Sequence, residues 1–220
     1  MQEFLTDYPF FEKEGETSRT KGNLPHWNQK NKIYFITFRL GDSLPLDVLR
    51  RYEEYCKYQE HVIETNGGLP EDWKRYEVEK HNKVLNYLDK GYGSCLLKQS
   101  AVRKIVVDAL HFFDGDCCLI HDYVIMPNHV HLLVEMLDDA SVTDMIGRVK
   151  KFSARTINKL LNRKGKLWQY ECFDRIVRSE YHYLRSVRYI ALNPYRLERG
   201  TYTLHLLLDH ESMFNIRSVE

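Results

Sequence analysis

The chain has 220 residues, of which 43% are hydrophobic and 13% aromatic, and its formal net charge at pH 7 is +1. This composition suffices for one buried core, so we expect residues 1–220 to form a single domain. No apolar run approaches the roughly 18 residues of a membrane helix, and the acidic N-terminus does not resemble a signal peptide. The five cysteines contain no CxxC pair, so we expect no structural zinc site. Together these features predict a cytoplasmic protein with reduced thiols.

The order of predicted elements indicates the fold class. Hydrophobic periodicity and turn residues predict a strand at 32–40, a helical hairpin at about 44–93 divided at 66–70, a helix at 100–113, a β-hairpin at 118–136 with its turn at Pro127-Asn128, a helix at 141–161, a strand at 172–179 and a helix at 180–193. The last helix should end before Pro194, because the residue before a proline disfavours helical geometry. This order predicts an α+β fold in which helices cover an antiparallel sheet.

Two histidines stand on the second strand of the predicted β-hairpin, HVHLLVEM. Side chains alternate along a strand, so every second residue of Val130–Met136 forms a wholly apolar face directed to a core. His129 and His131 share the other face, with about 7 Å between their Cα atoms. Two neutral imidazoles at this spacing can bind one divalent ion. Two surface histidines without a ligand are the alternative interpretation, and for an HxH pair alone the commoner one.

A third ligand and a nucleophile are available on the final helix. Tyr189 and Asn193 are four residues apart and therefore lie on the same helical face. If this face packs over the histidines, Asn193 can offer an amide oxygen to the metal while Tyr189 points its phenol to the same place. A core tyrosine is the alternative interpretation of Tyr189, and spacing does not decide between the two.

Three sequence blocks, YVIMPNHVHLLV, LWQYECFDRIVR and RYIALNP, occur in this order along the chain. They resemble the REP-associated tyrosine transposases, which belong to the single-tyrosine HUH (histidine, hydrophobic, histidine) transposases of single-stranded insertion elements. The resemblance extends from about Leu24 to Pro194. The three blocks together are far more specific than HxH alone.

The resemblance implies a ferredoxin-like or RRM-like nuclease core and an enzyme that cleaves and transfers single-stranded or hairpin DNA through a 5′-phosphotyrosine. It assigns His129 and His131 as metal ligands, Asn193 as the third ligand and Tyr189 as the nucleophile. It also implies Mg²⁺ or Mn²⁺ as the cofactor. Both monomers and homodimers occur among such proteins.

Basic residues supply candidate DNA contacts. Residues 148–166 hold eight bases and no acid, whereas residues 41–82 hold ten acids and six bases. The basic stretch indicates either a face that binds a polyanion or a solvated helix with surplus lysines. Because this helix directly follows the histidine strand, we expect it to lie beside the bound DNA. The candidate phosphate contacts are Lys150, Lys151 and Arg155 on this helix and Arg178, Arg185 and Arg188 around Tyr189.

Two segments depart from the resemblance. The segment at about 44–93 is longer than the compact core of the smallest relatives, and its acidity argues against phosphate binding. We interpret it as a helical insertion outside the sheet that shapes substrate access. The tail after Pro194 matches the family poorly and receives no chemical role.

Two other functions fit part of the pattern. A non-catalytic module for single-stranded nucleic acid would use the basic stretch without Tyr189. A small metallohydrolase would use zinc on His129 and His131, but no third histidine or aspartate stands in a matching motif. The joint presence of the histidine pair, Tyr189 and Asn193 favours the nuclease over both.

Overall fold

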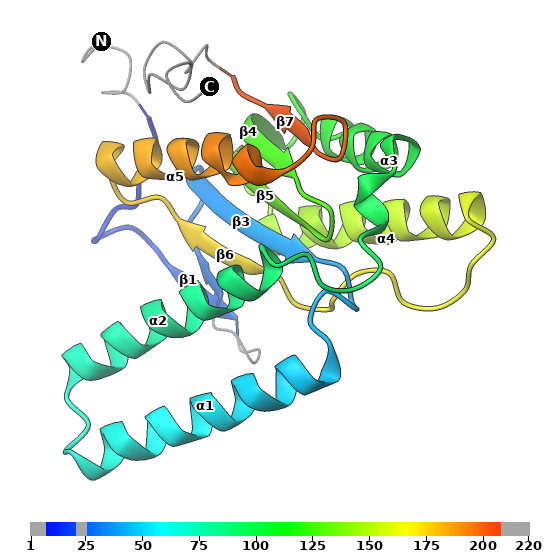
Figure 1. Ribbon diagram of the computed structural model, residues 1–220. Coiled ribbons are helices and arrows are strands. Elements are labelled where there is room, and N and C mark those ends of the chain that lie inside the picture. The colour runs from blue at the N-terminus through cyan, green and yellow to red at the C-terminus, as the bar shows by residue number, and fades with distance from the viewer. Residues whose placement is uncertain (1–7, 21–25, 208–220) are drawn as a thin grey trace.

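The computed structural model describes residues 8–20 and 26–207. Its centre is a five-stranded antiparallel sheet with the strand order β6-β3-β5-β4-β7 (Figure 1). The strands are β3 (Ile33–Arg39), β4 (Cys118–Ile125), β5 (His129–Met136), β6 (Phe173–Ile176) and β7 (Thr203–His205). A separate two-stranded sheet pairs β1 (Ser18–Thr20) with β2 (His26–Asn28).

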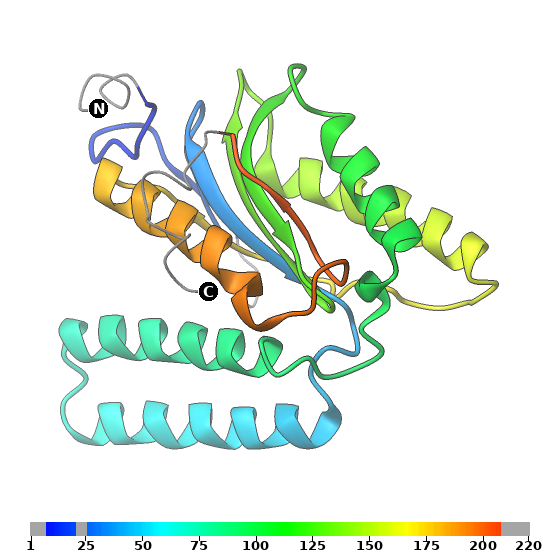
Figure 2. The same ribbon diagram turned by 45° about the horizontal axis from the view of Figure 1, so that its top comes forward.

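Helices lie on both faces of the sheet and beyond its β6 side. They are α1 (Leu46–Thr65), α2 (Pro70–Leu88), α3 (Ser100–His111), α4 (Val142–Leu160) and α5 (Glu180–Leu192). Helices α3 and α4 cover one face and α5 covers the other, while α1 and α2 form a hairpin beside them (Figure 2). The predicted α+β class is confirmed. None of the helices in the described ranges combines the length and apolar character that crossing a membrane requires.

The alternation of side chains along β3 and β5 separates two cores. Val130, Leu132, Val134 and Met136 are buried on the α3–α4 face, as the sequence predicts. The other face carries Leu133, which packs with the apolar side of α5. Because His129 and His131 share this second face, the fold directs both imidazoles toward α5.

The predicted helical hairpin is present as α1 and α2. Gly67 and Gly68 both have positive φ angles, which a residue with a Cβ rarely adopts, and they end the first helix. Pro70 opens the second helix at a position where its missing N–H costs nothing. The end of α2 returns to the sheet, where Leu85 and Leu88 join Leu44 in a small core that also contacts Tyr189.

The tail contributes one strand that the sequence does not predict. β7 pairs with β4 at the edge of the sheet. The buried Arg103 of α3 holds this segment, since its guanidinium donates to the Gly200 carbonyl at 2.6 Å and to Thr203 Oγ1 at 2.9 Å. The tail beyond residue 207 lies outside the described residues. The five cysteines, all within the described ranges, form no disulfide.

Candidate metal and tyrosine site

The two histidines meet beneath the end of the helical hairpin. Both side chains are fully buried, so the interpretation as surface residues is wrong. Their Nε2 atoms are 2.9 Å apart, and the ring planes are nearly perpendicular. The tight turn at Pro127-Asn128 positions His129 at the first residue of β5, and strand alternation brings His131 to the same side.

Neighbouring polar groups orient each imidazole through its Nδ1 atom. Asn128 donates its amide hydrogens to the backbone carbonyls of Leu88 and Tyr92, at 3.2 and 3.1 Å, so its Oδ1 must face His129. His129 Nδ1 therefore donates to that oxygen at 2.7 Å and leaves its Nε2 with a free lone pair. For His131, Nδ1 lies 2.8 Å from Thr37 Oγ1, which again leaves Nε2 facing the site.

Helix α5 brings Tyr189 to the histidine pair within one chain. Its hydroxyl lies 3.4 Å from His131 Nε2, and its ring contacts His131 and Phe35 edge to face. Asn193 caps the C-terminal end of α5 with helical φ and ψ angles, so the predicted one-turn spacing from Tyr189 holds. The two elements that the sequence prediction requires to meet do meet.

Burial determines protonation at the site. It lowers the pKa of His129 to about 3 and the pKa of His131 well below its ordinary value, so both rings are neutral at pH 7. Burial also raises the pKa of Tyr189, the Asp89 carboxylate raises it further, and a hydrogen bond with Asn193 opposes both. Neutral imidazoles are the form that binds metals, while the phenol keeps its proton without a nearby cation.

The donor set fits a divalent ion only if a ligand other than His, Cys, Asp or Glu takes part. Within the described ranges, those four residue types provide no group of three that could hold a metal. Asn193 Oδ1 supplies a candidate, because it is buried and has no hydrogen-bond partner among the described residues. The 2.9 Å between the two Nε2 atoms also agrees with two ligands placed about 2.1 Å from one ion at a right angle.

The basic residues predicted to contact DNA lie on both faces of the sheet. Helix α4, which carries Lys150, Lys151 and Arg155, packs on the face opposite the histidines, so its expected position beside the site is wrong. Helix α4 lies there because its apolar side packs against the face of the sheet that carries Val130. Lys150 also donates to the three consecutive carbonyls of residues 169–171 and thereby holds a loop, an arrangement that does not favour phosphate contact.

The remaining basic candidates have exposed side chains. Lys151 and Arg155 are exposed on α4, as are the apolar side chains of Phe152 and Leu160. Arg178, Arg185 and Arg188 are exposed at the start of α5 and along it, on the same helix layer as Tyr189. Their DNA contacts remain predictions.

Several residues at the site were not predicted from the sequence. Thr37 and Arg39 on β3 stand directly across from His131 and His129 in the strand register. Their signal is visible in KIYFITFRL, where the two polar residues interrupt one face of an otherwise apolar strand. Asp89, 3.9 Å from His129 Nε2 through its Oδ1, has no such signal because it reaches the site only through the folding of the hairpin.

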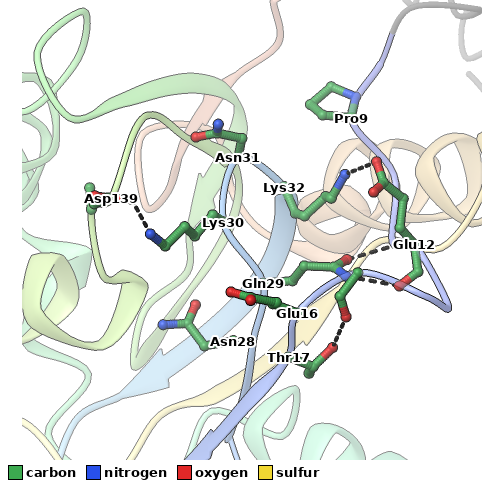
Figure 3. Close-up of a pocket in the computed structure, with 12 residues that line it drawn as sticks. Pro9, Glu12, Glu16, Thr17, Asn28, Gln29, Lys30, Asn31, Lys32 and Asp139 are labelled. Atoms are coloured by element: carbon green, nitrogen blue, oxygen red, sulfur yellow. Dashed lines mark hydrogen bonds and ion pairs between the residues drawn. The ribbon is translucent and has the colours of Figure 1, made fainter.

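A pocket of about 770 Å³ lies at the other end of β3 (Figure 3). Its lysines are neutralised, since Lys32 pairs with Glu12 at 2.6 Å and Lys30 pairs with Asp139. The pocket opens near Lys32. Arg39, the β3 residue across from His129, is seven residues further along the strand, which corresponds to about 20 Å. This pocket is therefore separate from the histidine site.

We predict that Asn128→Ala weakens divalent metal binding by about 10- to 100-fold, because the His129 ring loses the acceptor that fixes its tautomer. The variant also leaves two backbone carbonyls without their donor, which should lower the free energy of unfolding by about 1–3 kcal/mol. Titration calorimetry with Mn²⁺ and urea denaturation measure the two effects. The exposed Asn86→Ala on α2 is the control, and equal Mn²⁺ affinity in both variants contradicts the assigned role.

Acid should destabilise the fold through its buried histidines. Since the folded pKa of His129 is about 3 and the unfolded value is near 6.5, the unfolded state binds more protons between these values. Stability is then fully present above pH 6.5 and falls on acidification, by about 1.4 kcal/mol per pH unit for each neutral histidine. Asp122, whose pKa burial raises to about 6, acts in the opposite direction, but His81, His121 and His131 add to the loss. Urea denaturation between pH 7 and pH 5 tests this, and stability that stays constant or rises contradicts it.

Comparison with known proteins supports the motif-based resemblance. Residues 99–191 match the family model described as "Transposase IS200 like", a segment that includes the histidine pair and Tyr189 and ends two residues before Asn193. A comparison with curated proteins gives no match. Two solved structures show distant likeness. A REP-associated tyrosine transposase bound to a REP hairpin has 12% identity and a TM-score of 0.46, over 80% of this chain and 74% of the other.

The second structure is that of a protein from Deinococcus radiodurans R1 described as a transposase, with 12% identity and a TM-score of 0.32, over 83% of this chain and 97% of the other. Neither likeness is close enough to assign residues or ligands in this chain. The family match, by contrast, covers the elements that build the site, from α3 to α5. The segment that holds the histidine pair and Tyr189 therefore matches the model of the IS200-like transposases, in agreement with the resemblance that the sequence motifs indicate.

Proposed function

We propose that the chain is a metal-dependent enzyme that cleaves single-stranded, hairpin-containing DNA and joins it to another strand through Tyr189. The single observation that carries this proposal is the 3.4 Å between the Tyr189 hydroxyl and His131 Nε2 in one chain. A phenol in that position is next to the imidazole nitrogens that would bind a cation, and the cation would in turn bind the phosphate. A tyrosine with a purely structural role would have no reason to stand beside two imidazole nitrogens that can both bind one cation.

The reaction that fits this arrangement is a transesterification. Tyr189 Oη loses its proton and forms a bond to phosphorus, the bond from phosphorus to the 3′ oxygen breaks, and that oxygen takes a proton. The DNA is left with a free 3′-hydroxyl and a 5′-phosphate on the tyrosine. Because the number of phosphoester bonds is conserved, a different 3′-hydroxyl can reverse the step and join two strands without ATP.

His129, His131 and Asn193 would hold the divalent ion, for which we propose Mg²⁺ or Mn²⁺. When bound, such an ion polarises the scissile phosphate and stabilises the charge that develops on its oxygens. Paired imidazoles alone favour softer metals, but an amide oxygen, water and phosphate oxygens complete a shell that suits hard cations. Burial of the histidines keeps them neutral and available for this role over the physiological pH range.

The sequence blocks resemble those of the REP-associated tyrosine transposases, and this resemblance implies single-stranded DNA with hairpins as the substrate class. We include the assignment of this chain to the REP-associated subgroup in the proposal. The exposed Arg178, Arg185 and Arg188 give the α5 side a positive rim that suits a phosphate backbone. The histidine pair and Tyr189 come together within one chain, which supports cleavage by a single copy without a homodimer.

The direct test uses hairpin oligonucleotides with random single-stranded flanks, labelled with fluorescein at either the 3′ or the 5′ end. In Mn²⁺ or Mg²⁺, we expect the 3′ label to stay with the protein on a denaturing gel while the 5′ label is released. EDTA should prevent both products. Cleavage without an adduct would indicate a water nucleophile and support the hydrolase, and binding without cleavage in any metal would support the non-catalytic module.

A further inference from the structure

A cleft of about 310 Å³ lies between the helical hairpin and the sheet, next to the histidine site. Its floor is formed by β3 and by the segment that enters β6, and its wall by α1 and α2. It is lined by residues that include Thr37, Arg39, Tyr52, His81, Gln169 and Phe173. None of these residues belongs to the metal or tyrosine set described above.

The cleft adjoins the reaction site through β3. Thr37 lines the cleft and also contacts His131 Nδ1 at 2.8 Å. Arg39 lines it two residues further along the same strand face, and its cross-strand partner is His129. A group bound in the cleft is therefore next to β3, one strand away from the histidines proposed to hold the metal ion.

The walls of the cleft are flat and aromatic. The His81 ring on α2 stacks on the Phe173 ring of β6 with centroids 3.6 Å apart and planes 19° from parallel. Tyr52 on α1 adds a third ring to the lining. One face of each of these two rings is covered by the other, so a nucleobase would stack on the outer face of the pair or on Tyr52, and such a contact tolerates any base because each base has a π face.

Polar groups in the cleft suit the edge of a base better than a second phosphate. Arg39 supplies donors, and within the described ranges its guanidinium takes part in no ion pair, although it donates to Ser43 Oγ at 3.1 Å. Gln169 supplies a donor and an acceptor, and the Glu171 carboxylate is also part of the lining. The lining thus mixes Arg39 and Lys80 with a carboxylate and lacks the uniform positive charge that favours a phosphate, and Lys80 already lies 3.8 Å from Glu60 and from Glu77. Base edges, by contrast, carry both donors and acceptors.

We propose that this cleft binds an unstacked nucleobase of the single strand, beside the phosphate that Tyr189 attacks. The inference rests on the proposed function and adds to it a base-binding pocket built by the helical hairpin. The acidic hairpin thus has a role that needs no phosphate contact, since its apolar and aromatic inner side holds the base. The guanidinium of Arg39 reads the edge of that base or positions the sugar next to it.

Fluorescence anisotropy with two fluorescein-labelled 20-mers tests the pocket, in EDTA so that no cleavage occurs. One probe is single-stranded DNA of random sequence and the other is a fully abasic deoxyribose-phosphate chain of the same charge. We expect the full-length protein to bind the DNA at least about tenfold more tightly than the abasic chain. Tyr52→Ala, which removes a ring, and Val84→Phe, which narrows the cleft from α2, should each reduce this preference at least about fivefold while affinity for the abasic chain is unchanged.

Matched controls come from the outer side of the same helices. Tyr58→Ala on α1 and Val78→Phe on α2 change exposed residues and should keep the wild-type preference. If Tyr52→Ala loses helix content by circular dichroism, Val84→Phe decides the result. Wild-type protein that binds neither probe overturns the proposed function and this inference together. Wild-type preference that persists in both cleft variants overturns the pocket alone and leaves the proposed function standing.

Discussion

Tyr189→Phe should abolish the covalent protein–DNA adduct, with a loss of cleavage on the order of 10⁴-fold or more, because it removes the phenolic oxygen that we propose forms the phosphotyrosine. The fold should survive, since the hydroxyl makes one long contact of 3.4 Å with His131 and interacts with Asn193. A change in the free energy of unfolding of about 1 kcal/mol is expected for the loss of such a polar contact. The 3′-labelled oligonucleotide assay measures the adduct, and urea denaturation measures the stability.

Tyr181→Phe is the matched control, because Tyr181 lies on the same helix and is 71% exposed. It should form the adduct at the wild-type rate. If Tyr189→Phe still forms an adduct, another of the 15 tyrosines is the nucleophile and the assignment of Tyr189 is wrong. Mapping the modified peptide would then identify the residue concerned.

Replacing His129 and His131 together with leucine should eliminate both metal binding and cleavage, because leucine fills a comparable volume but offers no nitrogen ligand. For the wild type, Mn²⁺ at 100 times its dissociation constant should stabilise the fold by about 2.7 kcal/mol. That corresponds to a rise in Tm of about 5–10 °C for a chain of this size. The double variant should show no rise, and its cleavage should fall on the order of 10³-fold or more.

Differential scanning fluorimetry with and without Mn²⁺ separates ligand loss from a general loss of stability. The metal-free double variant is expected to be less stable, since Asn128 and Thr37 lose their imidazole partners, but this effect is independent of Mn²⁺. His61→Leu, at an exposed position of α1, is the control and should keep the full Mn²⁺ effect. A double variant that Mn²⁺ still stabilises would show that the metal binds elsewhere.

The parts of the site that sequence predicts are those set by local periodicity. Alternation in HVHLLVEM places His129 and His131 on one face, and the four-residue spacing of a helix places Tyr189 one turn from Asn193. These relations hold in almost any packing of the two elements. Apolar residues on the histidine face of the sheet, such as Leu133, then pack with the inner side of α5 and bring the two elements together.

Relations between distant segments are harder to predict for a physical reason. The pattern of α4 shows which of its residues are apolar, but not which face of the sheet they cover, and the helix packs opposite the histidines. The role of Asn128 depends on two carbonyls from the hairpin, and Asp89 reaches His129 from the same place. β7 is three residues long, too short for any periodicity to appear.

The position of α5 has a consequence for how copies of the protein can work together. Because Tyr189 and the histidine pair face one another within one chain, each copy carries the nucleophile and the histidine ligands that we propose. A mixture of Tyr189→Phe chains with chains that lack His131 should therefore stay inactive, since neither copy can lend its intact half to the other. Subunit complementation of this kind would require α5 to exchange between copies, and the core that Tyr183, Val187 and Ile190 form with the sheet opposes such an exchange.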